Sequence, residues 1–159
     1  MMLHLERRVG YMLGQTHRRL CAELGARFRP YDMTNEQWGV LIRLIEEEGI
    51  TQKKLAERCG KDQPTLTRII QLLMRKGWVE RAICKQDRRA YRLAATPAGR
   101  SVVEQLVPIE QECIAQVMAG FTSEEEQRLL ESLHRIQNNV AMAEKERLTA
   151  SSNESGEDR

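Results

Sequence analysis

The segment Asp62-Gln-Pro-Thr-Leu-Thr-Arg-Ile-Ile-Gln-Leu-Leu-Met-Arg75 decides the fold of this chain. Its first residue can cap a helix N-terminus, and Pro64 lies in the first turn, where a missing amide hydrogen costs nothing. The apolar residues follow the i, i+3, i+4, i+7 spacing of an amphipathic helix: Leu66, Ile69, Ile70 and Leu73. The segment therefore predicts a helix with one buried and one polar face, ended by Gly77.

The sequence on both sides of this helix predicts further short elements. Thr51 is suited to cap a helix over 52–59, and Gly60 to form the tight turn that follows. Two strands are expected over 79–83 and 91–95, joined by a charged turn. Thr96-Pro97 begins another helix. Two short helices, a β-hairpin and a helix are typical of a winged helix-turn-helix, a fold that places one helix in a DNA groove.

Longer helices are expected outside this lobe. An amphipathic helix is predicted over about 3–28, and capping boxes at Thr34–Gln37 and Thr122–Glu125 begin two more. The last has apolar residues on one face: Leu129, Leu133, Ile136 and Val140. The fold class is thus mainly α with a small β-hairpin wing. We expect residues 31–96 to form a winged helix-turn-helix DNA-binding domain, 1–30 and 97–148 to form a helical dimerisation region, and 149–159 to be a disordered tail.

The charge of the chain is concentrated in its centre. The 159 residues carry a net charge of only +2. Residues 51–92, however, hold 12 Lys or Arg against 4 Asp or Glu, whereas 93–159 hold 6 against 12. This distribution indicates a phosphate-facing surface between a neutral and an acidic arm.

The polar face of the central helix carries side chains that can contact DNA. The Gln63 amide suits adenine, the Arg68 fork suits guanine, and Thr65 suits a base or a phosphate. Thr67 points to the side, where the DNA backbone would lie. The candidate DNA contacts on this helix are therefore Gln63, Thr65, Thr67, Arg68, Gln71 and Arg75.

The hairpin turn Cys84-Lys-Gln-Asp-Arg-Arg-Ala90 supplies a second set of candidates. Arg88 and Arg89 are adjacent cations that can enter a narrow minor groove, where the potential is most negative. Lys85 adds a third cation, and Asp87 can orient a neighbouring arginine or cap the turn.

These motifs together resemble the MarR (multiple antibiotic resistance regulator) family of transcription factors. The resemblance is carried by Thr34-x-x-Gln-Trp38, Thr51-Gln-x-x-Leu-Ala56, Thr65-x-Thr-Arg68, Gly77-Trp-Val-Glu-Arg81, Asp87-Arg-Arg89 and Thr96-Pro-x-Gly99. It implies a homodimer that binds a pseudo-palindromic operator in double-stranded DNA. It also implies repression of transcription and release by a small aromatic or anionic effector. Ala95 departs from the family pattern, which has Leu before the Thr.

Other functions fit parts of the sequence. A winged-helix protein-interaction module could use the same basic surface for an acidic partner, and a non-specific architectural binder would need no base contacts. A thiol-based redox regulator of the same fold is a third alternative. Its candidate cysteines are Cys21, in the first helix, and Cys84, beside Lys85.

Several function classes find no support in the sequence. His4, His17 and His134 have no metal-ligand spacing, and no nucleophile-base order or Gly-rich phosphate loop indicates an enzyme or a cofactor. The sequence contains no run of 18 apolar residues and therefore predicts no membrane span. Since the first residues lack the apolar core of a signal peptide, we expect a cytoplasmic protein with free thiols.

Overall fold

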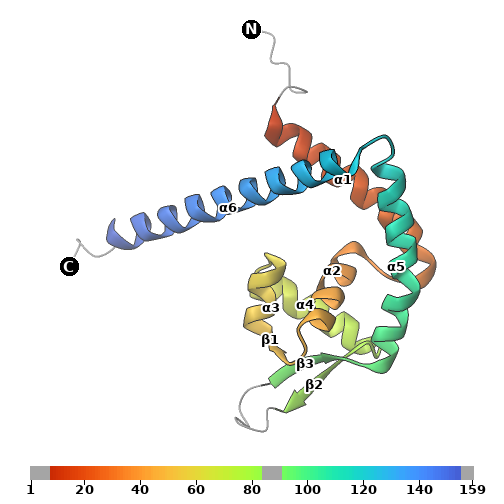
Figure 1. The fold of residues 1–159 in the computed structure, drawn as a ribbon. Coiled ribbons are helices and arrows are strands. Elements are labelled where there is room, and N and C mark those ends of the chain that lie inside the picture. The colour runs from red at the N-terminus through yellow and green to blue at the C-terminus, as the bar shows by residue number, and fades with distance from the viewer. Residues whose placement is uncertain (1–7, 84–90, 155–159) are drawn as a thin grey trace. The chain divides into compact units, whose positions relative to one another are not determined.

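The computed structural model describes residues 8–83 and 91–154, which form helices and one small sheet (Figure 1). The elements are, in order, α1 (Val9–Phe28), the 3-10 helix η2 (Arg29–Tyr31), α2 (Asn35–Glu46), β1 (Ile50–Thr51), α3 (Gln52–Cys59), α4 (Gln63–Arg75), β2 (Val79–Ile83), β3 (Tyr91–Ala95), α5 (Pro97–Val117) and α6 (Ser123–Glu154). The chain divides after Val117 into two compact units.

The predicted helix caps are confirmed. Thr34 Oγ1 accepts the Gln37 N–H at 3.2 Å, and Gln37 Oε1 accepts the Thr34 N–H at 3.3 Å, which completes the capping box of α2. Thr51 Oγ1 accepts the Lys54 N–H at the start of α3. Gly60 ends α3 with φ of +59°, a conformation in which a side chain would be strained.

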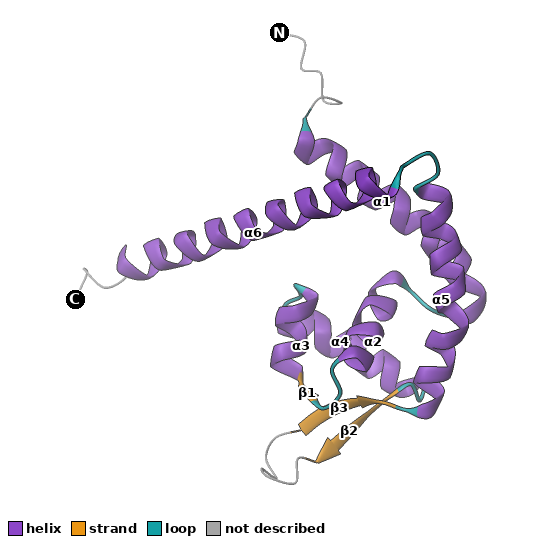
Figure 2. Cartoon of the chain, in the orientation of Figure 1, coloured by secondary structure: helices purple, strands orange, loops and turns teal. Residues whose placement is uncertain are grey.

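The sheet has three strands, not the two that the sequence predicts. Its order is β1-β3-β2 with antiparallel pairs, in which Ile50 lies opposite Leu93 and Val79 opposite Ala95. β1 has only two residues, too few to show an alternating pattern, so that only its pairing with β3 defines it. Figure 2 shows the strands together at one end of the lobe.

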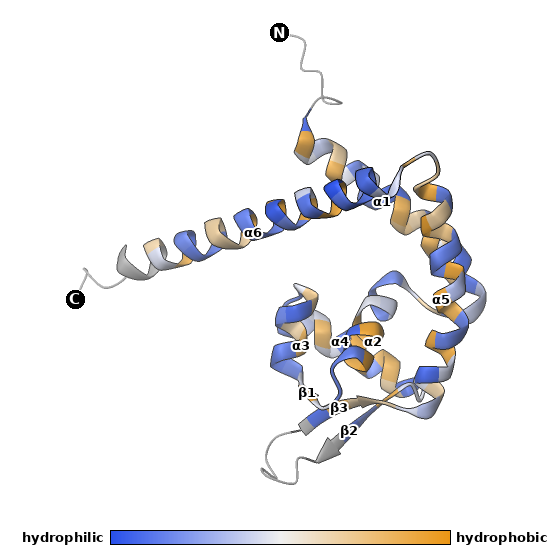
Figure 3. Ribbon diagram, viewed as in Figure 1, coloured by the Kyte–Doolittle hydropathy of each residue, from blue (hydrophilic) through white to orange (hydrophobic). Residues whose placement is uncertain are grey.

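The core of the first unit lies between α2, α3, α4 and the sheet. The apolar face of α4 is fully buried as predicted, with Leu66, Ile69, Ile70 and Leu73 each at most 1% exposed. Figure 3 shows hydrophobic positions along α2 and α4. The Phe28 and Trp38 rings meet with centroids 5.0 Å apart. Ala95, where the family pattern has Leu before the Thr, is also buried.

Two outer helices contribute to this same core. Leu24 and Phe28 of α1, and Val103, Leu106 and Cys113 of α5, are buried in it. The first compact unit therefore extends beyond the winged-helix boundaries at 31 and 96 that we expect from the sequence, because apolar faces of α1 and α5 pack on the lobe. A dimerisation role for these helices stays a prediction.

Helix α6, in the second unit, begins at the predicted capping box and is longer than expected. Thr122 Oγ1 accepts the Glu125 N–H at 3.3 Å, and the Glu125 carboxylate accepts the Thr122 N–H at 2.8 Å. The helix continues past Thr149, where we expect a tail to begin, and ends at Glu154. Extending an existing helix costs little, so polar residues can continue it. Residues 155–159 lie outside the described chain.

Gly99 allows α5 to begin directly against the turn that joins α4 to β2. The Thr96 N–H donates to Trp78 O at 3.0 Å, Thr96 Oγ1 donates to Gly77 O at 2.6 Å, and the Gly99 N–H donates to Thr96 Oγ1 at 3.1 Å. A Cβ at Gly99 would overlap the Trp78 carbonyl oxygen and lie 3.0 Å from its carbonyl carbon. This close approach fixes the direction of α5 relative to the sheet.

We expect Gly99→Ala to lower the free energy of unfolding by about 2 kcal/mol or more, because the new methyl group forces the backbones apart. The measurement is the urea midpoint at a fixed protein concentration. Gly39→Ala is the matched control, since a Cβ there meets nothing within 4 Å, and it should leave the midpoint equal or higher. Equal midpoints for Gly99→Ala and wild type would show that this close approach is not a constraint.

Candidate nucleic-acid interface

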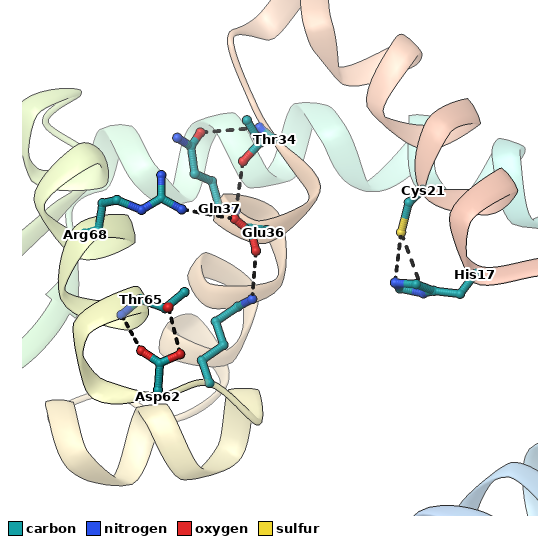
Figure 4. A network of polar contacts seen from close by, with 9 residues as sticks. His17, Cys21, Thr34, Glu36, Gln37, Asp62, Thr65 and Arg68 are labelled. Atoms are coloured by element: carbon teal, nitrogen blue, oxygen red, sulfur yellow. Dashed lines mark hydrogen bonds and ion pairs between the residues drawn. The ribbon is translucent and has the colours of Figure 1, made fainter. Parts of the chain in front are cut away.

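The N-terminus of α4 is fixed by Asp62. Its Oδ1 accepts the Thr65 N–H at 2.8 Å, and its Oδ2 accepts the Thr65 hydroxyl at 2.8 Å (Figure 4). These two hydrogen bonds, the one from the backbone first, lower the pKa of the Asp62 carboxyl below its ordinary value. The first turn of α4 is therefore held in one conformation at neutral pH.

The polar face of α4 is open to solvent. Gln63, Arg68, Gln71 and Arg75 are exposed, and Thr65 is half-buried. Thr67 is also half-buried, and its hydroxyl donates to Gln63 O at 2.8 Å and accepts from Gln52 Nε2 at 2.6 Å. Thr67 thus joins α3 to α4. The DNA contacts assigned to these residues stay predictions.

The predicted wing contacts lie outside the described residues. This applies to Lys85, Asp87, Arg88 and Arg89, and to Cys84. The strands that carry the turn, β2 and β3, have the predicted bounds.

One acidic residue that sequence reasoning missed lies beside the face of α4. Glu36, in the first turn of α2, places Oε2 3.7 Å from Arg68 Nη2 and Oε1 3.1 Å from Lys61 Nζ (Figure 4). The side chain of Arg68 is nevertheless 65% exposed. The sequence places Glu36 in the Thr34–Gln37 capping segment, and nothing in that spacing indicates a contact with a residue 32 positions later.

The three described cysteines are free thiols. Cys21 Sγ lies 3.6 Å from Nε2 of His17, one helical turn earlier (Figure 4). Burial raises the pKa of the Cys59 thiol, an effect that the nearby Arg43 and Lys61 partly oppose. A raised pKa leaves less thiolate, so Cys59 is less reactive than an ordinary thiol.

Two cavities lie beside α1 and α2. The larger, of about 460 Å³, is lined by residues of α1 and of the segment that leads into α2. The smaller, of about 350 Å³, is lined among others by His17, Cys21, Glu36, Arg43, Cys59 and Lys61. Asn35 borders both cavities and donates through Nδ2 to Cys21 O at 2.5 Å. No sequence pattern identifies these pocket residues, because they come together only when α1 packs on α2.

Residues 8–83 and 91–154 contain no helix long and apolar enough to cross a membrane. The same ranges contain no group of three or more His, Cys, Asp or Glu side chains arranged to hold a metal ion.

Comparison with known proteins identifies the family. Residues 31–90 match the model of the MarR family. The uncharacterized HTH-type transcriptional regulator YybA of Bacillus subtilis (strain 168) is 30% identical over 128 residues, which cover 80% of this chain and 85% of that protein. The chain belongs to the MarR family. It is a DNA-binding transcriptional regulator, in a family of regulators and not of enzymes.

Solved structures agree with this MarR-family fold. The transcriptional regulator SlyA is 27% identical with a TM-score of 0.77, over 83% of this chain and 93% of that one. MepR of S. aureus, solved in complex with DNA, is 22% identical with a TM-score of 0.76, over 85% of this chain and 98% of that one, and shows the fold alone. The predicted fold class is thereby confirmed.

We expect Asp62→Ala to lower the urea midpoint at pH 7, because α4 loses its cap. The wild-type carboxyl has a lowered pKa in the folded protein, so its contribution is present above the ordinary pKa of Asp and disappears as the pH falls through the lowered value. The midpoints of wild type and variant should therefore converge below about pH 4. A constant difference from pH 7 to pH 3 would contradict the assigned role of the carboxylate.

Proposed function

We propose that the chain is a cytoplasmic, homodimeric repressor that binds a pseudo-palindromic operator through α4 of each protomer and is released by a small effector. The observation that carries this proposal is the two-sided character of α4. One face is fully buried, the N-terminus is capped, and the opposite face exposes Gln63, Arg68, Gln71 and Arg75. In helix-turn-helix proteins, such a face contacts base edges in the major groove.

The chemistry of this face suits sequence recognition. An arginine can form two hydrogen bonds with guanine, and a glutamine can do so with adenine. Backbone phosphates would supply most of the affinity through the basic centre of the chain, so that binding should weaken steeply as salt rises. Sequence preference separates this function from a non-specific binder and from a protein-interaction module.

The exposed apolar residues of α6 support a homodimer. None of its described side chains is buried, and Leu129, Leu130, Val140, Met142 and Leu148 are between 40% and 66% exposed. Figure 3 shows these apolar positions at intervals along an otherwise hydrophilic helix. A long helix gains most of its stability by packing an apolar face, so α6 needs a partner. A second copy of the chain is the simplest partner for a protein that binds a two-fold operator.

The cavities beside α1 and α2 support control by a small molecule. The smaller cavity is lined by the cationic side chains of Arg43 and Lys61 and by Glu36, which pairs with Lys61, so that Arg43 is the cation that would attract an anionic ligand. Its volume of about 350 Å³ lies at the low end of the range for small-molecule sites. An effector bound there would contact α2, which packs against α4.

The test is footprinting of the purified protein on DNA from upstream of its own gene, at two salt concentrations. A protected palindrome with half-sites about one helical turn apart, weakening with salt, is the expected result. If this fragment and a genomic selection both yield only uniform coverage, the operator is excluded and the protein-interaction module takes its place.

We expect Arg68→Ala to weaken operator binding by about 1–3 kcal/mol and to relax the preference at one base pair of each half-site. The measurement is a titration against operators that vary at single positions. Arg19→Ala, an exposed arginine on α1, is the control for the loss of one charge and should keep every preference. Unchanged preferences in the Arg68 variant would show that α4 is placed wrongly on the DNA.

We expect Leu133→Asp to shift the protein from dimer to monomer and to lose binding to the full palindrome, since it places a charge in the apolar face of α6. Sedimentation velocity measures the first effect and gel shifts the second. Asn138→Asp adds the same side chain on the opposite face of this helix and should remain dimeric. A Leu133 variant that stays dimeric would move the interface away from this face.

A further inference from the structure

We infer that Glu36 is a positioning residue for sequence readout, because its carboxylate holds one end of the Arg68 guanidinium and leaves the rest of the fork free for a base. This inference rests on the proposed function of α4. Glu36 belongs to α2, outside the helix that would enter the groove, and so would act through Arg68 without touching a base itself.

The geometry of the pair indicates that Glu36 orients the Arg68 guanidinium and does not only neutralise its charge. Nη2 of Arg68 lies 3.7 Å from Oε2 of Glu36, an ion-pair distance longer than a hydrogen bond, and the described residues form no other ion pair with this guanidinium. The Arg68 side chain stays 65% exposed while paired, so its other N–H groups face solvent. An arginine has five N–H donors in a rigid plane, and fixing one edge also orients the opposite edge.

Lys61 keeps the Glu36 carboxylate in place. Its Nζ lies 3.1 Å from Oε1, the oxygen that Arg68 does not contact, and its side chain is only 22% exposed. The carboxylate is thus held between a half-buried cation and the outward-facing arginine (Figure 4). Its place in the first turn of α2 is also favourable, since a helix N-terminus attracts negative charge.

The same contacts should disfavour random DNA. A carboxylate close to the DNA backbone repels phosphates, and Lys61 and Arg68 are less available to phosphates while they hold it. On an operator, the free edge of Arg68 can bind a guanine while the other edge remains paired with Glu36. Because the guanidinium is already oriented, less side-chain entropy is lost on binding. Glu36 would therefore raise specificity in two ways.

The experiment compares Glu36→Gln with wild type on the operator and on a random-sequence duplex of the same length. Operator binding should weaken, whereas random-duplex binding should tighten by up to about eightfold at 0.1 M salt for each phosphate contact released. The salt slope on random DNA should steepen by about one unit per contact. Glu46→Gln, at the other end of α2, removes the same charge from an exposed residue and should leave the ratio of the two affinities unchanged.

A second variant and a double-mutant cycle separate the effect of side-chain length at position 36 from the effect of its charge. Glu36→Asp keeps the charge at the helix N-terminus but is one methylene shorter, so it should lose base preference as Glu36→Gln does. In an Arg68→Ala background, Glu36→Gln should have no further effect on that preference. Thermal melts establish that each variant is folded.

Each remaining outcome overturns the inference. Equal tightening on both duplexes would make Glu36 only a competitor for phosphate, and unchanged affinities for both duplexes would make the contact an ordinary surface ion pair. Failure of the proposed function is a separate result, in which the wild-type protein itself shows no footprint. The random-duplex measurement does not depend on knowing the operator.

Discussion

The complete burial of one face of α4 is the constraint on which the rest of the lobe depends. Its four apolar residues are at most 1% exposed and pack against α2, α3 and the sheet. Because a helix face is fixed once its opposite side is buried, this packing alone determines which side chains point outward. The candidate contacts Gln63, Arg68, Gln71 and Arg75 are exposed as a consequence of the core.

Polar contacts then fix the two ends of α4. At its N-terminus, Asp62 holds Thr65 by two hydrogen bonds. At its C-terminus, Lys76 Nζ donates to Gln37 Oε1 at 3.0 Å, pairs with Asp32 at 2.9 Å and lies 4.8 Å from the centre of the Trp78 ring. Gln37 also closes the capping box of α2, so one buried amide serves both helices. A buried acceptor shared in this way favours one arrangement of α2 and α4 over others.

The charged side chains of this lobe form specific ion pairs that the net charge of the chain does not reveal. Cations of the basic centre have defined acidic partners outside it: Glu47, for example, pairs with Lys54 at 2.5 Å and with Arg58 at 2.8 Å. The hydrogen bond from Lys54 lowers the pKa of the Glu47 carboxyl, against the opposing effect of desolvation. Exposed pairs of this kind add little stability. They do reduce the number of cations that are available to a phosphate backbone. Glu36 is important for this reason.

The sequence by itself determined the helix caps, the turn glycines, the bounds of β2 and β3, and the buried face of α4. Each depends on residues within a few positions of one another, so local chemistry suffices to predict it. Only the tertiary structure decided the third strand, the inclusion of α1 and α5 in the lobe core, the cavities and the Glu36–Arg68 contact. These depend on residues far apart in the chain, whose proximity no periodicity records. Helix α6 lies between the two cases, since its start is encoded by a capping box while its extension to Glu154 reflects the low cost of continuing a helix.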